Sequence, residues 1–367
     1  MWVERLELEG FRNYRMQAVD FHPQCNVIWG ENAQGKTNLL EAVAYLSCGR
    51  SPRTRTDREL IGFERQEAVL TAFLQGRERK YQVRAELSRE RRRRLFVNQV
   101  PAKTNAALSE VYHTVLFRPE DLFLIREGAS VRRKFLDNAL CQLRPRYAAA
   151  LAKYHRAQEQ KTRILRDAEK HPEFLQTLPE FNSQMIFYGA ALVHYRAWFI
   201  GQLTEYAAVH HRECSGGREA LTLRYQTVSS VRDTNAGAEE LMEDLRRHME
   251  SHEAAELASR SCLSGPHKDD LIVEIDGREA KSYSSQGQTR TAALALKLAE
   301  REIYQADGGV YPILLLDDVL SELDQRRQDF VLNRISGGQV FITCCEEDRL
   351  SQMLGGKVFQ VEHGTIL

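Results

Sequence analysis

One stretch decides the fold of this chain: Gly30-Glu31-Asn32-Ala33-Gln34-Gly35-Lys36-Thr37, which fits the pattern G-x-x-x-x-G-K-[ST] at every fixed position. The two glycines let the backbone turn so that successive N–H groups point into one anion-sized hollow. Lys36 can reach the β- and γ-phosphates of a nucleotide, and the Thr37 hydroxyl can ligate Mg²⁺. We therefore predict a phosphate loop over residues 30–37.

The residues on either side of the loop support this interpretation over a chance glycine turn. Residues 26–29 form a short, mostly apolar run that is typical of a strand. After Thr37, apolar residues recur at helical spacing at Leu39, Leu40, Val43 and Leu46. A helix that starts here places its positive end at the phosphates.

Composition sets limits on the partners. The 367 residues carry 51 basic and 51 acidic side chains, so nothing in the net charge requires nucleic acid or a membrane, and any basic surface is local. No apolar run approaches the length of a membrane span, and the N-terminus lacks a signal-peptide pattern. The seven cysteines are scattered, without a C-x-x-C pair, which favours reduced thiols in the cytoplasm.

Two arginine-rich segments are candidates for such a local basic surface. Arg91, Arg92, Arg93 and Arg94 form a dense run between two strand-like segments, which indicates either a DNA-backbone contact or a solvated hairpin tip. The loop Gly49–Arg55 carries three arginines just behind the predicted first helix. These arginines could contact phosphate, DNA or a partner subunit, or they could form a solvated turn.

The middle of the chain is predicted to be helical. Apolar residues recur at steps of three, four and seven from Tyr147 to Leu165 and again from Met185 to Tyr206, with a break flanked by Pro172 and Pro179. This spacing predicts two helices that pack as an antiparallel hairpin. The aromatic residues in these helices suit core packing, and the region contains no catalytic grouping.

Two further motifs lie in the last hundred residues. Residues 313–316 are four branched apolar residues followed by Asp317 and Asp318, which indicates a buried parallel strand whose end presents two acids beside the phosphate loop. Asp317 suits Mg²⁺, and Asp318 could polarise an attacking water. The segment Ser284–Arg290 places hydroxyl and glycine residues at the start of a helix, which is a second anion-site pattern.

Together these motifs resemble the ATP-binding-cassette ATPases. Lys36 and Ser285 are much farther apart than the same motifs in transporter cassettes, and only the branch with the SMC proteins splits the cassette around a large helical insertion. Within that branch the chain resembles the RecF family of bacterial recombination mediators. The matching stretches follow the family's order from end to end: Phe11–Tyr14, Gly30–Ala42, Phe117–Leu122, Arg132–Asp137, Gly265–Asp270, Ser285–Arg290, Leu316–Asp318 and Ser321–Asp324.

The resemblance implies an α/β fold in which both ends of the chain build one ABC-type ATPase head, a P-loop NTPase. We expect the head to comprise residues 1–120 and 260–367. Residues 121–259 would form an inserted helical domain, a short antiparallel coiled-coil-like arm.

The resemblance also implies roles for individual residues. ATP would be bound by Arg12, Asn13 and the loop Gly30–Asn38, with Mg²⁺ on Thr37 and Asp317, and Lys36, Asp317 and Asp318 would be catalytic. The signature residues would contact the nucleotide of a second head in trans, so that ATP joins a homodimer. They are Ser285, Gln286, Gly287 and Gln288, and the D-loop residues are Ser321 and Asp324.

Members of the resembled family bind double-stranded DNA and junctions of single and double strands, and they act with RecR, RecO and RecA. We therefore expect a weak DNA-stimulated ATPase that helps to load RecA. Two other classes are weighed against it. A transport ATPase is disfavoured by the split cassette, and a structural DNA clamp of the SMC type would bind ATP but barely hydrolyse it.

Three positions depart from the wider class. Most cassette ATPases have Glu after the magnesium-binding Asp, whereas this chain has the shorter Asp318, so we expect slow turnover. Glu120 lies where a magnesium-sensing Gln is usual, and its role is open. Thr343-Cys344 follows the last predicted core strand in place of the His of transporters, so no γ-phosphate switch is assigned.

Overall fold

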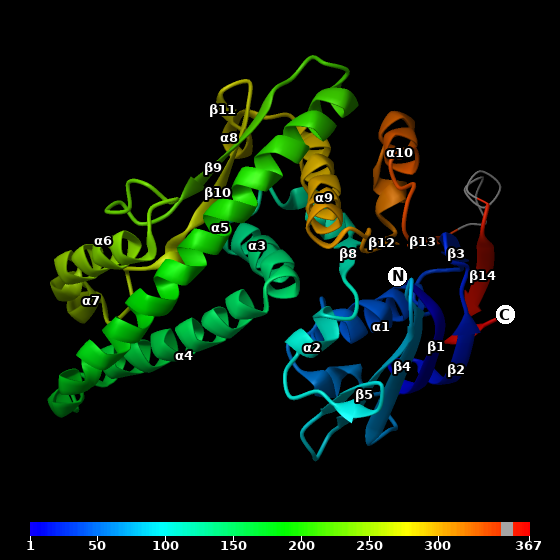
Figure 1. Ribbon diagram of the computed structural model, residues 1–367, viewed down its shortest axis with the longest axis horizontal. Coiled ribbons are helices and arrows are strands. Elements are labelled where there is room, and N and C mark those ends of the chain that lie inside the picture. Colours follow the sequence, from blue (N-terminus) through cyan, green and yellow to red (C-terminus); the bar gives the residue numbers. More distant parts are fainter. Residues whose placement is uncertain (346–354) are drawn as a thin grey trace. The chain divides into compact units, whose positions relative to one another are not determined.

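The computed structural model describes residues 1–345 and 355–367 (Figure 1). The chain forms two compact units. The first unit comprises Met1–Leu122 together with Lys297–Leu367, and the second comprises Phe123–Leu296. The chain therefore leaves the first unit once and returns to it within the helix α9 (Gln286–Gly308). Among the described residues, no helix combines the length and the apolar character that a membrane span requires.

The first unit contains a six-stranded antiparallel sheet with the strand order β2-β1-β4-β5-β6-β7. Val3 and Leu6 are both fully buried although they are three residues apart, because a register shift between Val3 and Arg5 returns the next side chain to the core face. The strands are β1 (Trp2–Phe11), β2 (Tyr14–Asp20), β4 (Glu67–Gln75), β5 (Lys80–Ser88), β6 (Arg94–Val97) and β7 (Val100–Pro101).

The second sheet of this unit has the order β15-β14-β3-β13-β12-β8, and its strands are parallel except for the terminal hairpin strand. Parallel pairing brings the carboxyl ends of β3, β13 and β12 to one edge, where ligand sites form in such sheets. The strands are β3 (Cys25–Trp29), β8 (Thr114–Phe117), β12 (Ile313–Asp317), β13 (Val340–Cys344), β14 (Lys357–Glu362) and β15 (Thr365–Ile366).

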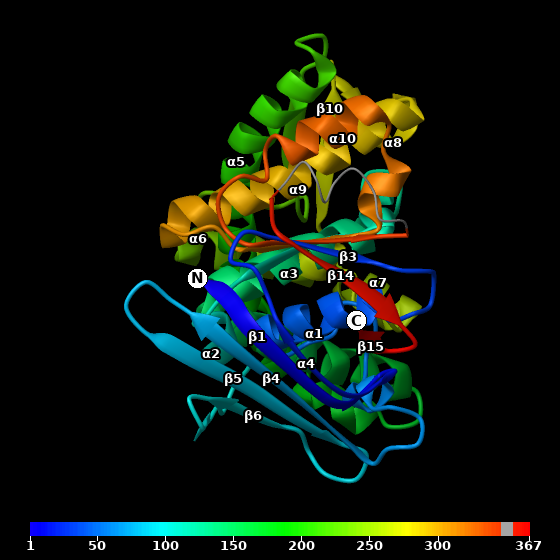
Figure 2. The ribbon, with the colours of Figure 1, turned by 90° about the vertical axis from the view of Figure 1, so that its right-hand side faces the viewer.

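The helix α1 (Lys36–Cys48) follows the phosphate loop and packs against strands of both sheets (Figure 2). Leu39, Val43, Tyr45 and Leu46 are all fully buried. Contact on two sides explains why apolar residues surround this helix instead of forming one stripe. The predicted strand–loop–helix arrangement is thus confirmed. The short helices of the unit are η1 (Asp57–Leu60), α2 (Ala106–Ser109), η2 (Pro119–Phe123), η5 (Val319–Glu322) and α10 (Gln325–Leu332).

The second unit is mainly helical. The predicted hairpin is confirmed, with α4 (Pro145–Asp167) packed along α5 (Leu178–Ser215) (Figure 1). The unit also has a small antiparallel sheet in the order β11-β10-β9. Its other elements are α3 (Ala129–Leu143), η3 (Pro172–Thr177), β9 (Leu221–Gln226), α6 (Ala238–Ser251), α7 (Glu253–Ser259), η4 (Pro266–Lys268), β10 (Asp270–Ile275), β11 (Arg278–Glu279) and α8 (Ala280–Tyr283).

Residues 260–296 group differently from the domain boundary that we expected. We assigned them to the ATPase head, whereas their contacts place them in the second unit. The reason is strand pairing: β10 pairs with β9 along its whole length, from Asp270 opposite Gln226 to Ile275 opposite Leu221. Such pairing joins segments that are distant in sequence, and helical periodicity carries no information about it.

A buried ion-pair network holds the second unit together. The Arg196 guanidinium, with its side chain 2% exposed, lies 2.8 Å from both Asp137 and Asp269. Arg132 binds both carboxylate oxygens of Asp270, each at 2.7 Å. Two of the stretches that carry the family resemblance, residues 132–137 and 265–270, therefore meet here. Loss of one partner would leave a buried charge uncompensated, which costs roughly 3–5 kcal/mol in such pairs.

His267, in η4, gives this unit a pH-dependent stability. Its Nδ1 lies 2.7 Å from the Tyr154 hydroxyl, and its Nε2 lies 3.1 Å from the Cys262 carbonyl. A neutral ring satisfies both contacts, with Nε2–H as donor to the carbonyl. Burial lowers the pKa of His267 to about 4. As the pH falls, His267 therefore takes up a proton in the unfolded state before it does so in the folded state. The free energy of unfolding decreases as the pH falls from the ordinary histidine pKa toward 4.

We expect His267→Gln to destabilise the protein at pH 7.5 and to lose much of that effect at pH 5. The lowered pKa of His267 contributes at most about 3 kcal/mol to the free energy of unfolding of wild type at neutral pH. Wild type loses this contribution on acidification, whereas the variant never has it. Urea unfolding of both proteins at the two pH values measures the difference. An equal difference between His267→Gln and wild type at both pH values would contradict this prediction.

Candidate functional site

The phosphate loop Gly30–Thr37 connects β3 to α1, and its glycines are required by close neighbours. A Cβ on Gly30 would lie 2.4 Å from the Val361 carbonyl oxygen, and one on Gly35 would lie 2.7 Å from Nδ2 of Asn13. Both residues also have φ values that L side chains rarely adopt, 151° and 122°. The pattern therefore reflects packing of the loop against β14 and the β1–β2 turn as well as phosphate binding.

Lys36 is buried, and its ammonium group is held by the loop itself. Nζ donates to the carbonyl oxygens of Gly30 at 2.6 Å and Glu31 at 3.1 Å. These bonds fold the side chain back over the loop backbone, so that its charge lies at the mouth of the loop. A bound phosphate would meet this cation together with the N–H groups at the start of α1.

Two residues that precede the loop in sequence, Arg12 and Asn13, hold the loop and the start of α1 in place. The Asn13 amide donates to the Gln34 carbonyl at 2.7 Å and accepts from Asn38 at 2.8 Å. Arg12 donates to both carboxylate oxygens of Glu41, each at 2.9 Å, and the Glu41 side chain is only 1% exposed. We predicted nucleotide contacts for Arg12 and Asn13. In this structure their polar groups are bonded to the loop and to α1.

Arg53 is the arginine of the Gly49–Arg55 loop that reaches the site. Its guanidinium donates to Asn38 Oδ1 at 2.8 Å and lies 3.5 Å from Glu41. Burial raises the pKa of Asp317, and the positive charge of Arg53 offsets a small part of that rise. From the sequence, this loop could contact phosphate, DNA or a partner subunit, or form a solvated turn. The available signal was an arginine-rich turn directly after the helix that begins at the phosphate loop.

The acids at the end of β12 meet the loop at Thr37. The Thr37 hydroxyl donates to Asp317 Oδ1 at 2.9 Å, and Asp317 is 6% exposed. Burial raises the pKa of Asp317 above its ordinary value, while hydrogen bonds from Thr37 and Thr343 act in the opposite direction. A hydroxyl beside a carboxylate supplies the hard oxygen ligands that Mg²⁺ prefers. These two residues therefore fit the ion, and they are the residues that would hold it.

Asp318 has an unusual backbone conformation. Its φ of 51° and ψ of 10° lie in the left-handed region, which is uncommon for residues other than glycine. Its backbone N–H donates to the Thr343 hydroxyl at 2.8 Å. Its Oδ1 is buried, and within residues 1–345 and 355–367 it has no hydrogen-bond partner. This oxygen could therefore accept a proton, as a general base does.

The end of β13 also contributes to the site. Cys345 Sγ donates to Asn32 Oδ1 at 3.3 Å and lies 3.9 Å from Lys36 Nζ. We assigned no switch residue after this strand and gave Cys345 no role in the nucleotide site. Glu120, whose role we left open, is exposed in η2 and lies 3.9 Å from Arg118.

The signature residues 285–288 begin α9 with reciprocal hydrogen bonds. The Ser285 N–H donates to Gln288 Oε1 at 2.8 Å, and the Gln288 N–H donates to Ser285 Oγ at 3.2 Å. This arrangement is a capping box with Gln in the third helical position. Gln288 is further held by its amide, which donates to Glu219 at 3.1 Å. Ser285 therefore defines the first turn of a helix whose N-terminus can attract an anion.

The two D-loop residues organise the chain after Asp318. The Ser321 hydroxyl donates to the Asp318 carbonyl at 2.6 Å. Asp324 caps α10 by accepting from the Arg327 N–H at 3.0 Å. Both side chains are bonded within this segment of the first unit.

The basic run Arg91–Arg94 is less uniform than we expected. Arg93 turns inward, with bonds to the Gly49 carbonyl at 2.6 Å and to Asp57 at 3.0 Å, and its side chain is 29% exposed. Arg91 and Arg94 remain exposed but pair with Glu67 and Glu86. Arg92 is exposed and has no ion pair among the described residues. The tentative DNA role of Arg93 is therefore replaced by a structural one, because its guanidinium fixes the loop behind α1.

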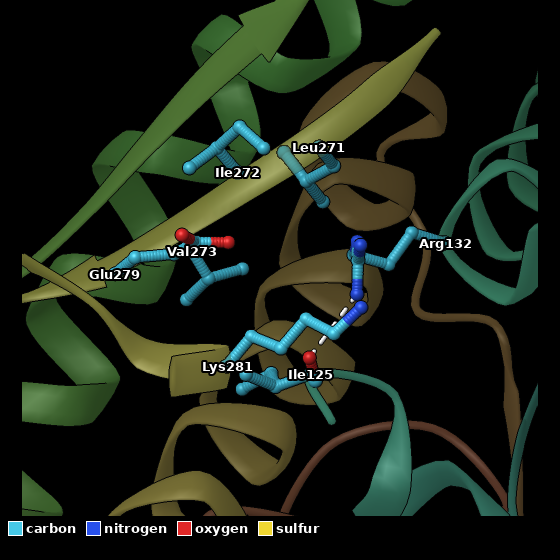
Figure 3. A pocket seen from close by; sticks show the side chains of 7 residues that line it. All are labelled: Ile125, Arg132, Leu271, Ile272, Val273, Glu279 and Lys281. Carbon is cyan, nitrogen blue, oxygen red and sulfur yellow. Dashed lines mark hydrogen bonds between the residues drawn. The ribbon is translucent and has the colours of Figure 1, made fainter. Parts of the chain in front are cut away.

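A cavity in the second unit is lined by residues around Arg132 and Leu271 (Figure 3). Arg132 crosses it and donates to the Ile125 carbonyl at 3.1 Å, as the dashed line shows. Its volume of about 10 Å³ admits no more than a water molecule. This cavity is therefore no site for a nucleotide.

Comparisons with known proteins find relatives that match the whole chain. The family model described as RecF/RecN/SMC N terminal domain matches residues 2–366. A protein of Agathobacter rectalis named DNA replication and repair protein RecF is 36% identical over 371 residues, covering 100% of this chain and 99% of that protein. A protein of the same name from Streptococcus suis is 38% identical over 373 residues, again covering 100% and 99%.

Solved structures support the same relationship. A structure described as the recombination mediator protein RecF-ATPrS in the RecFOR pathway matches with a TM-score of 0.93 and 30% identity, covering 100% of this chain and 97% of that one. A second, described as RecF-ATP, matches with a TM-score of 0.91 and 30% identity, with the same coverage. The Smc head domain of Pyrococcus furiosus shares the fold, with a TM-score of 0.55 and 15% identity over 100% and 95% of the chains. From its full-length match to both the family model and these relatives, the chain belongs to the RecF/RecN/SMC family of P-loop ATPases and, within it, to the RecF proteins.

Proposed function

We propose that this protein is an ATP-dependent DNA-binding protein of recombinational repair and a slow ATPase. The observation that carries the proposal is the 2.9 Å bond between Thr37 of the phosphate loop and Asp317 of β12, in a chain related to RecF proteins over its full length. This bond joins the two motifs that ATP hydrolysis needs at one sheet edge. We identify the nucleotide as ATP because a related structure is described as RecF-ATP.

In the proposed reaction, Lys36 neutralises charge on the β- and γ-phosphates while the N–H groups of the loop hold their oxygens. Asp318 accepts a proton from the water that attacks the γ-phosphorus, and ADP leaves with the bridging oxygen. When bound by Thr37 and Asp317, Mg²⁺ would neutralise developing charge on the phosphates. Asp318 is one methylene shorter than the usual Glu, which supports slow turnover and a role for hydrolysis in resetting the protein.

We further propose that two copies pair around ATP. The capped N-terminus of α9 places Ser285, Gln286 and Gly287 at the positive end of a helix, which attracts an anion. In the pair these residues would contact the γ-phosphate bound by the partner's phosphate loop. The binding energy of two enclosed ATP molecules would then stabilise the dimeric state.

DNA is the proposed partner of the pair, bound where double strand meets single strand. Together with RecR and RecO, the pair would help to load RecA at gaps. The exposed arginines 91, 92 and 94 support a local DNA contact on a chain of zero net charge. Arg91 and Arg94 would exchange their acidic partners for phosphates.

Replacing Arg91, Arg92 and Arg94 with Gln should weaken DNA binding and flatten its dependence on salt. Each lost phosphate contact removes about one unit from the slope of log affinity against log salt. Titrating a gapped duplex at several salt concentrations measures that slope. Arg93→Gln is the matched control, since it should lower thermal stability and leave the slope unchanged. An unchanged slope in the triple variant would show that the arginines form only a solvated turn.

The function as a whole is tested by sedimentation of the protein with and without ATP and gapped DNA, together with ATP turnover in each condition. We expect dimers that require ATP and turnover that rises with DNA. The alternative, a clamp of the SMC type, is favoured by the short Asp318 side chain and predicts ATP-dependent dimers with negligible turnover in every condition. If the sedimentation of the protein does not change with ATP and no ATP is hydrolysed, both the proposal and its alternative are contradicted.

A further inference from the structure

Thr343, near the end of β13, is bonded to both acids of the site at once. It is 1% exposed and lies directly opposite Asp317 in the parallel pairing of β12 with β13. Its Oγ1 lies 3.0 Å from Asp317 Oδ1 and 2.8 Å from the backbone nitrogen of Asp318. These two contacts define the direction of each hydrogen bond.

A backbone N–H can only donate, so Thr343 Oγ1 accepts from Asp318. The hydroxyl has one proton of its own, which it then donates to Asp317 Oδ1. This assignment uses the whole donor capacity of the hydroxyl. A valine at this position has almost the same shape and can make neither bond.

The bond to Asp317 fixes the orientation of a proposed magnesium ligand. Asp317 Oδ1 accepts from Thr37 on α1 and from Thr343 on β13, so two elements hold the carboxylate from two sides. Threonine suits this task because its branched side chain has few rotamers. Partners that hold a metal ligand typically change metal affinity or activity by about 10–100-fold when they are removed.

The bond from Asp318 supports a strained backbone. A residue other than glycine in the left-handed region is strained and keeps that conformation only if its surroundings enforce it. The Thr343 hydroxyl is the group that accepts the Asp318 N–H in this conformation. The direction of the Asp318 side chain therefore depends on a residue of the neighbouring strand.

We propose that Thr343 is a positioning residue that couples the two acids: it holds Asp317 for Mg²⁺ and Asp318 for the attacking water. The proposal rests on the proposed ATPase function. It explains why a threonine is fully buried beside the acid at the carboxyl end of β12. It also gives β13, the strand between β3 and β12, a part in the chemistry.

The test compares Thr343→Val with Thr343→Ser. We expect Thr343→Val to lower kcat by about 10–100-fold and to raise the Mg²⁺ concentration for half-maximal ATP binding by about 10-fold. KM for ATP at saturating Mg²⁺ should change little, because Lys36 and the loop are untouched. Thr343→Ser keeps the hydroxyl and should stay within about threefold of wild type in each measurement, since it can make both bonds.

Three controls separate positioning from folding and from the proposed function. Thr71→Val removes another buried hydroxyl from the first unit and should leave the Mg²⁺ dependence unchanged. Binding of a fluorescent ATP analogue in EDTA should be equal for wild type and Thr343→Val if the variant is folded. If wild type shows no turnover, the proposed function fails, while the Mg²⁺ dependence of nucleotide binding still tests Thr343.

Two results would overturn the proposal. One is a folded Thr343→Val protein with the kcat and Mg²⁺ dependence of wild type. The other is a folded Thr343→Ser protein whose kcat and Mg²⁺ dependence change as much as we expect for Thr343→Val, because the hydroxyl would then be irrelevant. The serine variant keeps the test decisive even if Thr343→Val does not fold.

Discussion

Lys36→Ala is expected to abolish ATP binding and ATP turnover together. The variant removes the cation whose ammonium lies over the phosphate loop, 2.6 Å from the Gly30 carbonyl. Hydrogen bonds to charged groups contribute roughly 1.5–3 kcal/mol each, so losing those to two phosphates should weaken binding by about 100-fold or more. Equilibrium dialysis with ATP and Mg²⁺ measures the affinity, and phosphate release measures turnover.

The control for this prediction is Lys80→Ala, which removes an exposed lysine that pairs with Glu4 in the antiparallel sheet of the same unit. It should bind ATP as wild type does. Thermal unfolding without nucleotide should show that Lys36→Ala is folded, because within residues 1–345 and 355–367 the Lys36 ammonium bonds only to carbonyls of its own loop and to Cys345. If folded Lys36→Ala binds ATP as tightly as wild type, the phosphate-loop interpretation is wrong.

Ser285→Arg is expected to leave ATP binding by the monomer nearly intact and to abolish ATP-driven dimerisation. In the proposed pair, residue 285 meets the partner's γ-phosphate, and arginine puts bulk at that contact. Lys36, Thr37 and Asp317 are unchanged. Sedimentation with ATP measures the dimer, and dialysis measures monomer binding.

Ser285→Ala separates bulk from loss of the helix cap. It removes the hydroxyl that accepts from the Gln288 N–H, which costs about 1 kcal/mol of helix stability. This variant should weaken the dimer, whereas the arginine variant should eliminate it. Asp318→Asn should act in the opposite direction. It removes the base and keeps the shape of the side chain, so ATP-bound dimers should accumulate and persist.

Mixing two variants gives the decisive observation. Ser285→Arg and Lys36→Ala can form a pair with one intact site, built from the phosphate loop of the first and the signature residues of the second. Dimers and residual turnover should therefore return in the mixture. If Ser285→Arg dimerises normally with ATP, or loses ATP binding as a monomer, the arrangement in trans is refuted.

Features that depend on neighbours in the chain could be predicted from the sequence. The phosphate loop, the strand before it and the helix after it are confirmed as β3 and α1, because glycine spacing and apolar periodicity act over a few residues. The helical hairpin of α4 and α5 is confirmed for the same reason. The motif order from Phe11 to Asp324 was sufficient to identify the family.

Features that depend on distant pairing were decided only by the tertiary structure. β13 lies between β3 and β12, which places Thr343 against Asp317 and Cys345 against Lys36. Arg93 belongs to a run of exposed arginines in the sequence, yet a carboxylate and a carbonyl of the loop behind α1 draw it inward.

The boundary at residue 260 shows the same limit, since β10 joins the second unit through its pairing with β9. A sequence pattern reports which face of an element is apolar and where it ends. The identity of the strand beside it is set by the free energy of the whole sheet and core, to which residues hundreds of positions apart contribute. For this protein the sequence alone therefore determined where the phosphate loop and the two acids lie along the chain, and the tertiary structure decided which side chains hold them in place.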